Sequence, residues 1–486
     1  MDVRQCPAEL GYTALVLSIM ANMKKEGISP DLLTYNTALE PFAHHGMSDE
    51  ALSLFDDMKA LDIPPDTQTF NLLLKALRFE DVHSSWQMVN MMKEFGVEPN
   101  AATYEVLVRR YKLSDNFEMG LKLLFEMEQL EIAPSLRTVQ DVIALAIRKG
   151  HARLALELAE NYEASSIRRL DDVTWIKCLT AATGTLYAEG VLRLWEKVVH
   201  SLKVIPDEGV CMEALHTAGR HGLPELAMDV LTTLRKMEVP LKEYHFAPIV
   251  EAFCQKGSLK EAFAILCTIR EHGIIPNAET SHPIFLYIRK NEDALDEAWS
   301  ALEALHEEGR QLDITAINVI VQASVSQGDL QRAIGTYQLC SELGLSPNVD
   351  TFNFLLSGAI GAQHRELGDR IVSDMKQANV CADGQTYERL VILCLTGETY
   401  EDAFFFLEEM KANQFVPPLS IYEAIIRRCV VDRDSRYKVA VEELQEQGYS
   451  VSRELQAFID SGGVPPKGNG SGGQNKTAKA AHDAVV

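Results

Sequence analysis

The hydrophobic residues of this chain recur every three or four positions in short segments that are separated by turns. In residues 32–66 the apolar side chains fall on one stripe of each of two helices. Gly46 lies between the two halves as a turn, and Pro64 ends the second half because proline cannot continue a helix. The pattern therefore predicts two short amphipathic helices joined by a tight turn.

The same pattern recurs along nearly the whole chain, with a period of about 35 residues. Threonine followed by an aromatic residue opens many units, with the aromatic residues at Tyr35, Phe70, Tyr104, Trp175, Phe352 and Tyr387. Proline followed by Asp or Asn closes many units, and we expect Asp66 and Thr69 to cap the next helix. A helical hairpin this short cannot bury its apolar face alone, so the spacing predicts a solenoid of stacked hairpins.

These marks divide the chain into twelve units with flanking segments. The units are 32–66, 67–100, 101–135, 136–171, 172–207, 208–242, 243–277, 278–313, 314–348, 349–383, 384–418 and about 419–452. Residues 1–31 are expected to hold the second helix of an earlier unit, as a partial repeat, and residues 453–460 to end a capping helix. Residues 461–486 are rich in Gly, Ser and Lys and lack aromatic residues, which predicts a disordered tail.

Composition limits the possible functions. The chain has 70 acidic and 46 basic residues, a formal net charge of -24, which is unusual for a protein that binds polyanions. Its nine cysteines are scattered without close pairs, which disfavours zinc sites. No apolar run approaches the ~20 residues of a membrane span, and no targeting peptide is visible at the N-terminus, which can be truncated. No catalytic motif emerges, so we predict neither an enzyme nor a cofactor.

Three minor features have simple interpretations. Cys254 and Cys394 are expected to be core thiols. The motif Gly468-x-Gly470-x-x-Gly473 matches a dinucleotide fingerprint by letter only, because no strand precedes it. The basic cluster of Arg427, Arg428, Arg433, Arg436 and Lys438 is either a contact for RNA or a ribosomal partner, or a solvated surface.

The units resemble the P-type repeats of the pentatricopeptide repeat family. Thr34-Tyr35-Asn36-Thr37 matches the start of such a repeat, and Met23-x-x-x-Gly27-Ile28-Ser29-Pro30-Asp31 matches its end. The related tetratricopeptide pattern requires a Leu-Gly pair and a Tyr that these units lack. The resemblance extends over about nine-tenths of the chain and implies an all-α fold, a right-handed α-solenoid.

The resemblance also implies binding of single-stranded RNA, one base per repeat, through the fifth and last residues of each unit. The pairs Asn36/Asp66 and Asn353/Asp383 then indicate U, and Asn71/Asn100 and Asn318/Asn348 indicate C or U. The other pairs depart from this pattern: Glu105/Ser135, Gln140/Asp171, Ile176/Asp207, Met212/Lys242, Ala247/Asn277, His282/Asp313 and Glu388/Pro418. Arg148, Arg220 and Lys290 stand at the thirteenth position, which in the family often contacts phosphate; alternatively they only complement the helix dipole.

Two functions follow from the resemblance. The first is a sequence-selective RNA-binding protein in mitochondrial (organellar) RNA processing, stability or translation, with messenger or ribosomal RNA as the target. The alternative is a protein-interaction scaffold in the assembly of the organellar ribosome or a respiratory complex. The Asn-led pairs favour RNA, whereas the net charge and the seven departing pairs favour the scaffold.

Overall fold

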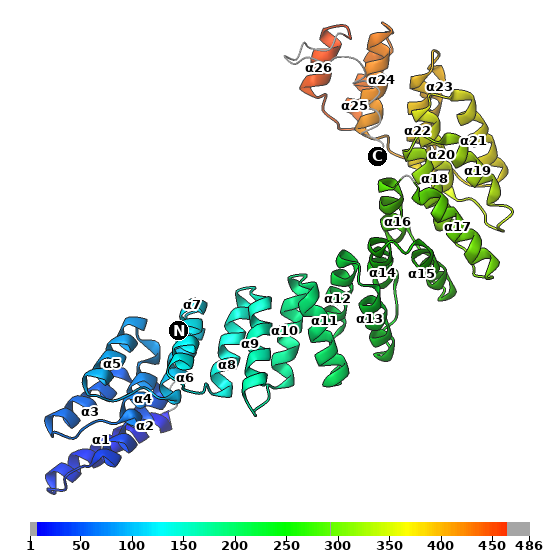
Figure 1. Ribbon diagram of the computed structural model, residues 1–486. Helices are drawn as coiled ribbons and strands as arrows, with labels where there is room; N and C mark the ends of the chain where they lie inside the picture. The colour runs from blue at the N-terminus through cyan, green and yellow to red at the C-terminus, as the bar shows by residue number, and fades with distance from the viewer. Residues whose placement is uncertain (1–6, 292, 464–486) are drawn as a thin grey trace. The chain divides into compact units, whose positions relative to one another are not determined.

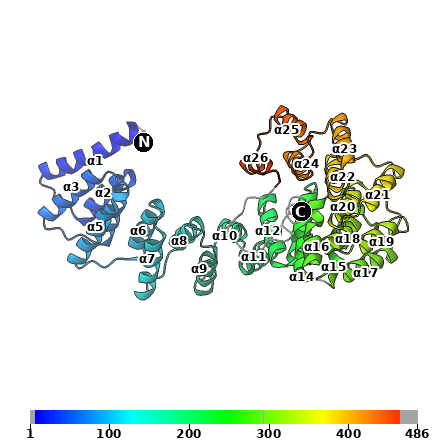
Figure 2. The same ribbon diagram turned by 90° about the horizontal axis from the view of Figure 1, so that it is seen from above.

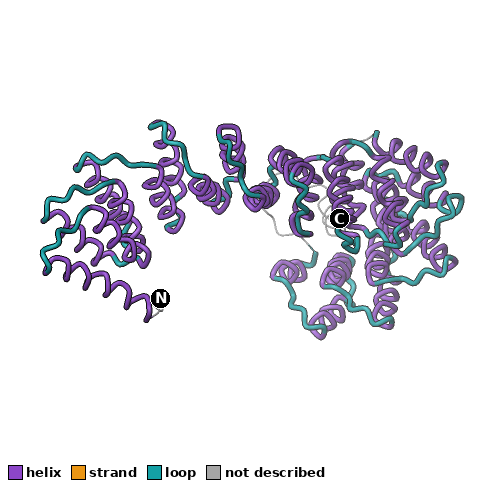
Figure 3. Tube along the Cα trace, turned by 90° about the horizontal axis from the view of Figure 1, so that it is seen from below, coloured by secondary structure: helices purple, strands orange, loops and turns teal. Residues whose placement is uncertain are grey.

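The structure is a computed structural model that describes residues 7–291 and 293–463. The described residues form helices and no strand (Figures 1 and 3). The fold is an all-α solenoid of helical hairpins, which confirms the fold class that the periodicity predicted. The predicted disordered tail from residue 464 onward and the glycine motif at 468–473 lie outside the described residues.

The helices group into two compact units, residues 1–217 and 218–486. The N-terminal unit begins with α1 (Pro7–Lys25), and five hairpins follow. These are α2 (Leu32–His45) with α3 (Ser48–Ala60), α4 (Thr67–Ala76, extended by the 3-10 turn η1, Leu77–Phe79) with α5 (Val82–Glu94), α6 (Ala101–Leu113) with α7 (Phe117–Gln129), α8 (Leu136–Arg148) with α9 (Ala152–Ser165), and α10 (Asp172–Gly184) with α11 (Ala188–Trp195) and the π-helix η2 (Glu196–Ser201). Helix α12 (Glu208–His221) spans the boundary between the units.

The C-terminal unit continues in the same order and ends in a short helix. It contains α13 (Pro224–Lys236), α14 (Glu243–Lys256) with α15 (Leu259–Glu271), α16 (Ala278–Lys290) with α17 (Ala294–Glu307), α18 (Ile314–Ser326) with α19 (Leu330–Leu339), α20 (Val349–Gly361) with α21 (Arg365–Gln377), α22 (Gly384–Thr396) with α23 (Glu401–Ala412), α24 (Leu419–Val431) with α25 (Tyr437–Glu446), and α26 (Arg453–Asp460).

The residues at the unit boundaries cap the helices that follow. The Asp66 carboxylate accepts the Thr69 backbone N–H at 2.8 Å, and the Thr69 hydroxyl accepts the Asp66 N–H at 3.3 Å. This reciprocal capping box satisfies N–H groups that have no partner within the helix. The predicted capping role of Asp66 and Thr69 is confirmed.

The turn inside the first hairpin requires glycine. Gly46 has φ +69°, in the left-handed region that glycine enters without strain. A Cβ atom at this position would lie 2.6 Å from the ring of Phe79 in the next hairpin. Gly46 therefore ends α2 and allows the second hairpin to approach. Its place in the turn agrees with the sequence prediction.

Within each unit the hairpins stack so that helices of the same rank form layers (Figures 1 and 2). Each first helix packs against the next, as α2 does on α4 and α20 on α22, whereas second helices pack mainly against first helices. We call α2, α4, α6, α8 and α10, and α14 through α24 in even numbers, the first-helix layers. The second-helix layers are the odd-numbered helices α3 to α11, with η2 after α11, and the odd-numbered helices α13 to α25. Buried aromatic residues such as Phe55 and Phe70, whose ring centroids are 5.6 Å apart, fill the space between the layers.

Candidate nucleic-acid interface

The four Asn-led pairs form the same hydrogen-bonded arrangement in both units. In each pair the asparagine amide donates to the last residue of its unit at 3.0–3.2 Å: Asn36 to Asp66, Asn71 to Asn100, Asn318 to Asn348 and Asn353 to Asp383. A threonine hydroxyl from the next unit donates to the asparagine oxygen at 2.6–2.8 Å: Thr69, Thr103, Thr351 and Thr386. The structure therefore brings together both members of every predicted pair.

The two members of a pair differ in burial. The fifth-position asparagines are 2–7% exposed, whereas Asn100 is exposed and Asp66, Asn348 and Asp383 are half-buried. Each asparagine holds the last residue in place, and the last residue presents its polar edge to the surface. Among the described residues, no hydrogen bond occupies Oδ2 of Asp66 or Nδ2 of Asn100. Asp66 thus offers an acceptor, and Asn100 offers a donor, to a molecule on this surface.

Hydrogen bonding shifts the titration of Asp66. Burial by itself raises the pKa of this carboxyl, but hydrogen bonds from the backbone and hydroxyl of Thr69 and from the Asn36 amide outweigh burial. The net pKa lies below its ordinary value, because these donors stabilise the ionised form. Asp66 is therefore a charged acceptor at neutral pH.

Two of the departing pairs keep the same contact. The Ser135 hydroxyl donates to Glu105 at 3.1 Å, and the Gln140 amide donates to Asp171 at 2.9 Å. The sequence pattern did not predict the contact in these two pairs, because only asparagine was considered at the fifth position. The signal was present as a polar fifth residue opposite a capping last residue. Ile176, Met212 and Ala247 have no polar side-chain atoms for such a contact.

The three predicted phosphate residues have different surroundings. Arg148 donates to the Lys112 carbonyl at 2.6 Å and lies 3.4 Å from the Asp115 carboxylate. Arg220 is highly exposed, and its nearest carboxylate, that of Glu251, is 3.9 Å away. Lys290 is exposed, and no ion pair to it occurs among the described residues. Of the three residues, Arg148 therefore makes the most contacts with other groups of the protein.

A further basic set lies on the first-helix layer of the N-terminal unit. Lys75, Arg137 and Lys177 stand at the ninth, second and sixth positions of their units, and all three are exposed. At 100° per residue these positions share one helix face with the fifth. No ion pair to any of the three occurs among the described residues. Reasoning from the thirteenth position alone missed them, although helical periodicity could have found them.

Charge is partitioned between the layers. The N-terminal first-helix layer, η1 included, has eight Lys and Arg against four Asp and Glu, whereas its second-helix layer has six against thirteen. The C-terminal first-helix layer has six of each, and its second-helix layer has ten against eighteen. Within the layers the acidic excess therefore lies on the second helices, and the N-terminal first-helix layer is net basic; the other segments of the chain carry the remaining charge of -13.

A hollow of about 380 Å³ opens beside one predicted pair in the C-terminal unit. Asn318 and Asn348 line it, together with Asn277 and Asp313, the last residues of two earlier units. Small organic ligands typically occupy sites of ~300–1,000 Å³. The hollow is thus large enough for a planar heterocycle beside the polar edge of this pair.

The remaining candidates contribute no chemistry to this surface. Cys254 and Cys394 are buried in the core as predicted, and burial raises their thiol pKa values to about 12 and about 11. Arg428 and Arg436, in the basic cluster, pair with Asp432 and Asp434 at 3.0 and 2.6 Å. None of the described helices is both long and apolar enough to cross a membrane.

Sequence comparisons agree with the repeat pattern. The profile of the PPR repeat family matches residues 32–79, that of the pentatricopeptide repeat domain matches 8–45 and 370–432, and that of a pentatricopeptide repeat-containing protein matches 208–340. A mitochondrial pentatricopeptide repeat-containing protein of Arabidopsis thaliana is 21% identical over 426 residues, 74% of this chain and 68% of that protein. Human pentatricopeptide repeat-containing protein 1, mitochondrial, is 30% identical over 127 residues, 26% of this chain but only 17% of that protein.

The chain is also similar to a solved structure. The pentatricopeptide repeat protein PPR10 in complex with an 18-nt psaJ RNA element is 16% identical, with 96% of this chain and 77% of that chain covered and a TM-score of 0.36. The sequence matches and the periodic hairpins identify the family. On those grounds the chain belongs to the pentatricopeptide repeat family.

Proposed function

We propose that this chain binds single-stranded RNA on its first-helix layers and selects pyrimidines at the four Asn-led pairs. The observation that carries the proposal is the repeated link from asparagine to the last residue and to threonine, found four times with distances that agree within 0.2 Å for each kind of bond. Helix capping accounts for the last residue and the threonine of each arrangement, but it does not require the asparagine that faces them.

The polar edges suit the Watson–Crick edges of unpaired bases. Uracil has an N3–H donor, which the Asp66 and Asp383 carboxylates accept. Asn100 and Asn348 carry an amide N–H as well as a carbonyl oxygen, so they complement the acceptors of either pyrimidine. The buried asparagines act as positioning residues, and the last residues contact the base.

The basic residues of the first helices supply the contact with phosphate. Lys75, Arg137 and Lys177 lie on the face that carries the fifth-position residues, and Arg220 and Lys290 extend the set. Cations on this face neutralise phosphates next to the bases, which supplies much of the affinity of any RNA-binding surface. The acidic second-helix layers do not oppose this binding strongly, because charges more than ~10 Å away are largely screened at 0.1 M salt.

The biological role is inferred from what the names of the relatives state. The mitochondrial relative from Arabidopsis thaliana points to the organelle, and RNA processing, stability or translation fits a chain that binds RNA without chemistry of its own. Whether the target is messenger or ribosomal RNA is decided by the sequence that the protein selects.

Selection of RNA from a random library by the purified chain tests the proposal. We expect enrichment of two pyrimidines, six variable positions and two further pyrimidines. The variant Asn36→Leu/Asn71→Leu should lose enrichment at one end only, and Asn318→Leu/Asn353→Leu at the other. Libraries that emerge without any enriched pattern, with equal binding of DNA and RNA, would overturn the proposal.

A further inference from the structure

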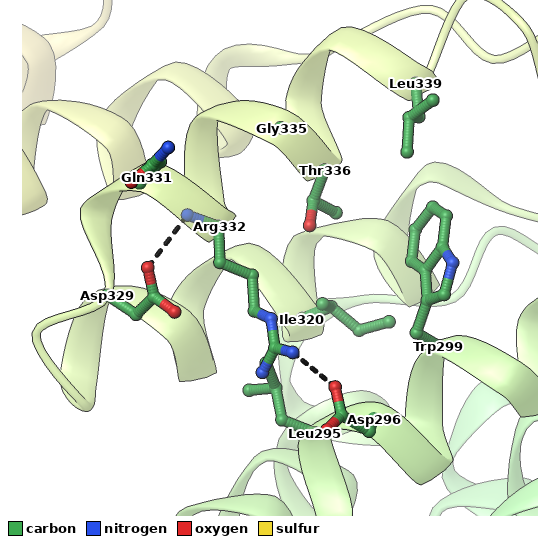
Figure 4. A pocket seen from close by; sticks show the side chains of 10 residues that line it. All are labelled: Leu295, Asp296, Trp299, Ile320, Asp329, Gln331, Arg332, Gly335, Thr336 and Leu339. Carbon is green, nitrogen blue, oxygen red and sulfur yellow. Dashed lines mark hydrogen bonds and ion pairs between the residues drawn. The ribbon is translucent and has the colours of Figure 1, made fainter.

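A second candidate surface lies in the second-helix layer of the C-terminal unit, away from the Asn-led pairs. A hollow of about 410 Å³ separates α17 from α19 (Figure 4). Leu295, Ile320 and Leu339 give it an apolar lining, and the indole of Trp299 stands beside Leu339 at its margin. None of these residues takes part in the proposed RNA site.

Small residues on α19 account for the hollow. Gly335 and Thr336 lie on the face of α19 that borders it, three and four residues after Arg332. The place of Thr336, seventh in its helix, is occupied by a larger apolar residue in nine other second helices: Leu54, Met88, Leu123, Leu158, Leu194, Val230, Ile265, Ile371 and Leu407. A Cβ atom at Gly335 would meet nothing within 4 Å. The side chains of α19 are therefore too small here to fill the space beside α17.

The charged residues that line the hollow are two carboxylates, Asp296 and Asp329, and one guanidinium, Arg332, and further carboxylates lie along α17. Helix α17 contains four carboxylates, of Asp296, Glu297, Glu303 and Glu307, and no Lys or Arg. Asp296 forms an ion pair with Arg332, and Glu303 accepts the Trp299 indole N–H at 2.7 Å. Asp329 caps α19 at the other side of the hollow. The apolar lining and these carboxylates together define the chemistry that this surface can accept.

We propose that this hollow binds a basic protein segment that carries one apolar anchor residue. The anchor would pack against Trp299 and Leu339, and flanking Lys or Arg side chains would pair with Glu303 and Asp329. Charge complementarity favours this occupant over RNA, because phosphates would face the carboxylates of α17. It also disfavours a second copy of this chain, whose own second-helix layers are acidic.

Fluorescence anisotropy with the full chain and labelled 12-residue peptides tests this proposal. The probes combine a central Leu, Phe or Trp with Lys/Arg flanks, and the comparison peptides have an Ala centre or Glu flanks. We expect the basic anchored peptides to bind at least tenfold more tightly than either comparison. Gly335→Leu, which fills the hollow, should weaken them at least tenfold, and Glu303→Gln should reduce the salt dependence while keeping an acceptor for the indole.

Gly361→Leu in α20 is the matched control, because a Cβ atom there also meets nothing within 4 Å. It should leave peptide binding unchanged, and thermal melts should show all three variants folded. Equal binding of all peptide classes, or equal binding by the Gly335→Leu variant, would overturn the proposal. So would a self-association in sedimentation that Gly335→Leu abolishes, since the occupant would then be a second copy. RNA affinity should be the same in wild type and Gly335→Leu, which separates this surface from the proposed RNA site.

Discussion

The two units carry the same hydrogen-bonded Asn-led pairs on first-helix layers of different charge. Each unit has two Asn-led pairs, and the amide of Asn36 lies 3.2 Å from Asp66 just as that of Asn353 lies 3.2 Å from Asp383. The N-terminal first-helix layer has twice as many basic as acidic residues, whereas the C-terminal layer has equal numbers. In the proposed function, base selection and phosphate attraction are therefore separable.

The comparison explains how a net charge of -24 is compatible with the proposed RNA-binding surface. Net charge sums over every surface, but a bound strand interacts mainly with charges within a Debye length, ~10 Å at 0.1 M salt. In the C-terminal unit the cation Arg389 is half-buried and donates to Ser357 at 2.8 Å, and burial lowers its pKa. It is less available to phosphate than the exposed Lys75 or Lys177 of the N-terminal unit. We expect the N-terminal unit to supply affinity and both units to supply selectivity.

The largest expected effect comes from reversing charge in the N-terminal unit. Lys75→Glu/Arg137→Glu/Lys177→Glu should weaken RNA binding about 100-fold at 0.1 M salt and lower the slope of log K against log salt by about 2, the loss of three phosphate contacts. The matched control Lys59→Glu/Lys93→Glu/Lys122→Glu changes the total charge equally but on the second helices. Filter binding across salt concentrations measures both, and equal losses in the two variants would refute the division between layers.

A smaller effect, the same in both units, is expected on the free energy of unfolding when the threonine that donates to the fifth-position asparagine loses its hydroxyl. Thr69→Val and Thr386→Val each leave a buried asparagine oxygen without its donor, which should lower the free energy of unfolding by about 1–3 kcal/mol. Urea unfolding measures the change, and Thr69→Ser is the control because it keeps the hydroxyl. If valine is neutral in one unit only, the two arrangements are not equivalent.

The next change alters selectivity without altering the fold. Asn100→Asp converts a pair proposed to accept either pyrimidine into one that resembles Asn36/Asp66. Asp caps helices as well as Asn does, so stability should hold. The preference for U over C at the corresponding position should rise about tenfold, ~1.4 kcal/mol. Competition binding with single C-to-U changes in the RNA gives the ratio, and a loss of affinity for both bases would mean that Asn100 is only a cap.

Much of the fold could be predicted from the sequence because its signals are local. Proline stops helices, glycine turns them, and a Pro-Asp boundary supplies the cap, as Gly46 and Asp66 show. The partners of the fifth residues lie about 30 positions away, yet the strict period made those pairs readable as well.

The remainder depends on neighbours that the period does not specify. The engagement of Arg148 by Asp115 and by the Lys112 carbonyl arises in a turn of the preceding unit. The hollow beside Trp299 depends on the small residues Gly335 and Thr336 of α19, which the marks of the repeat do not specify. The burial of the asparagines also could not be read, because a polar residue on a helix face is usually assigned to solvent.

The smallest expected effect is a difference in acid sensitivity between neighbouring repeats. The folded-state pKa of Asp66 lies below its ordinary value, so its ionised form contributes stability above the unfolded-state pKa, near 3.8. That contribution is lost as pH falls through the lower, folded-state pKa. Asn100 holds the same capping place in the next repeat without a titratable group. Urea midpoints between pH 5 and pH 3 should therefore fall slightly less for Asp66→Asn than for wild type, whereas Asn100→Asp should fall more; parallel curves for all three proteins would show that the Asp66 shift is not coupled to folding.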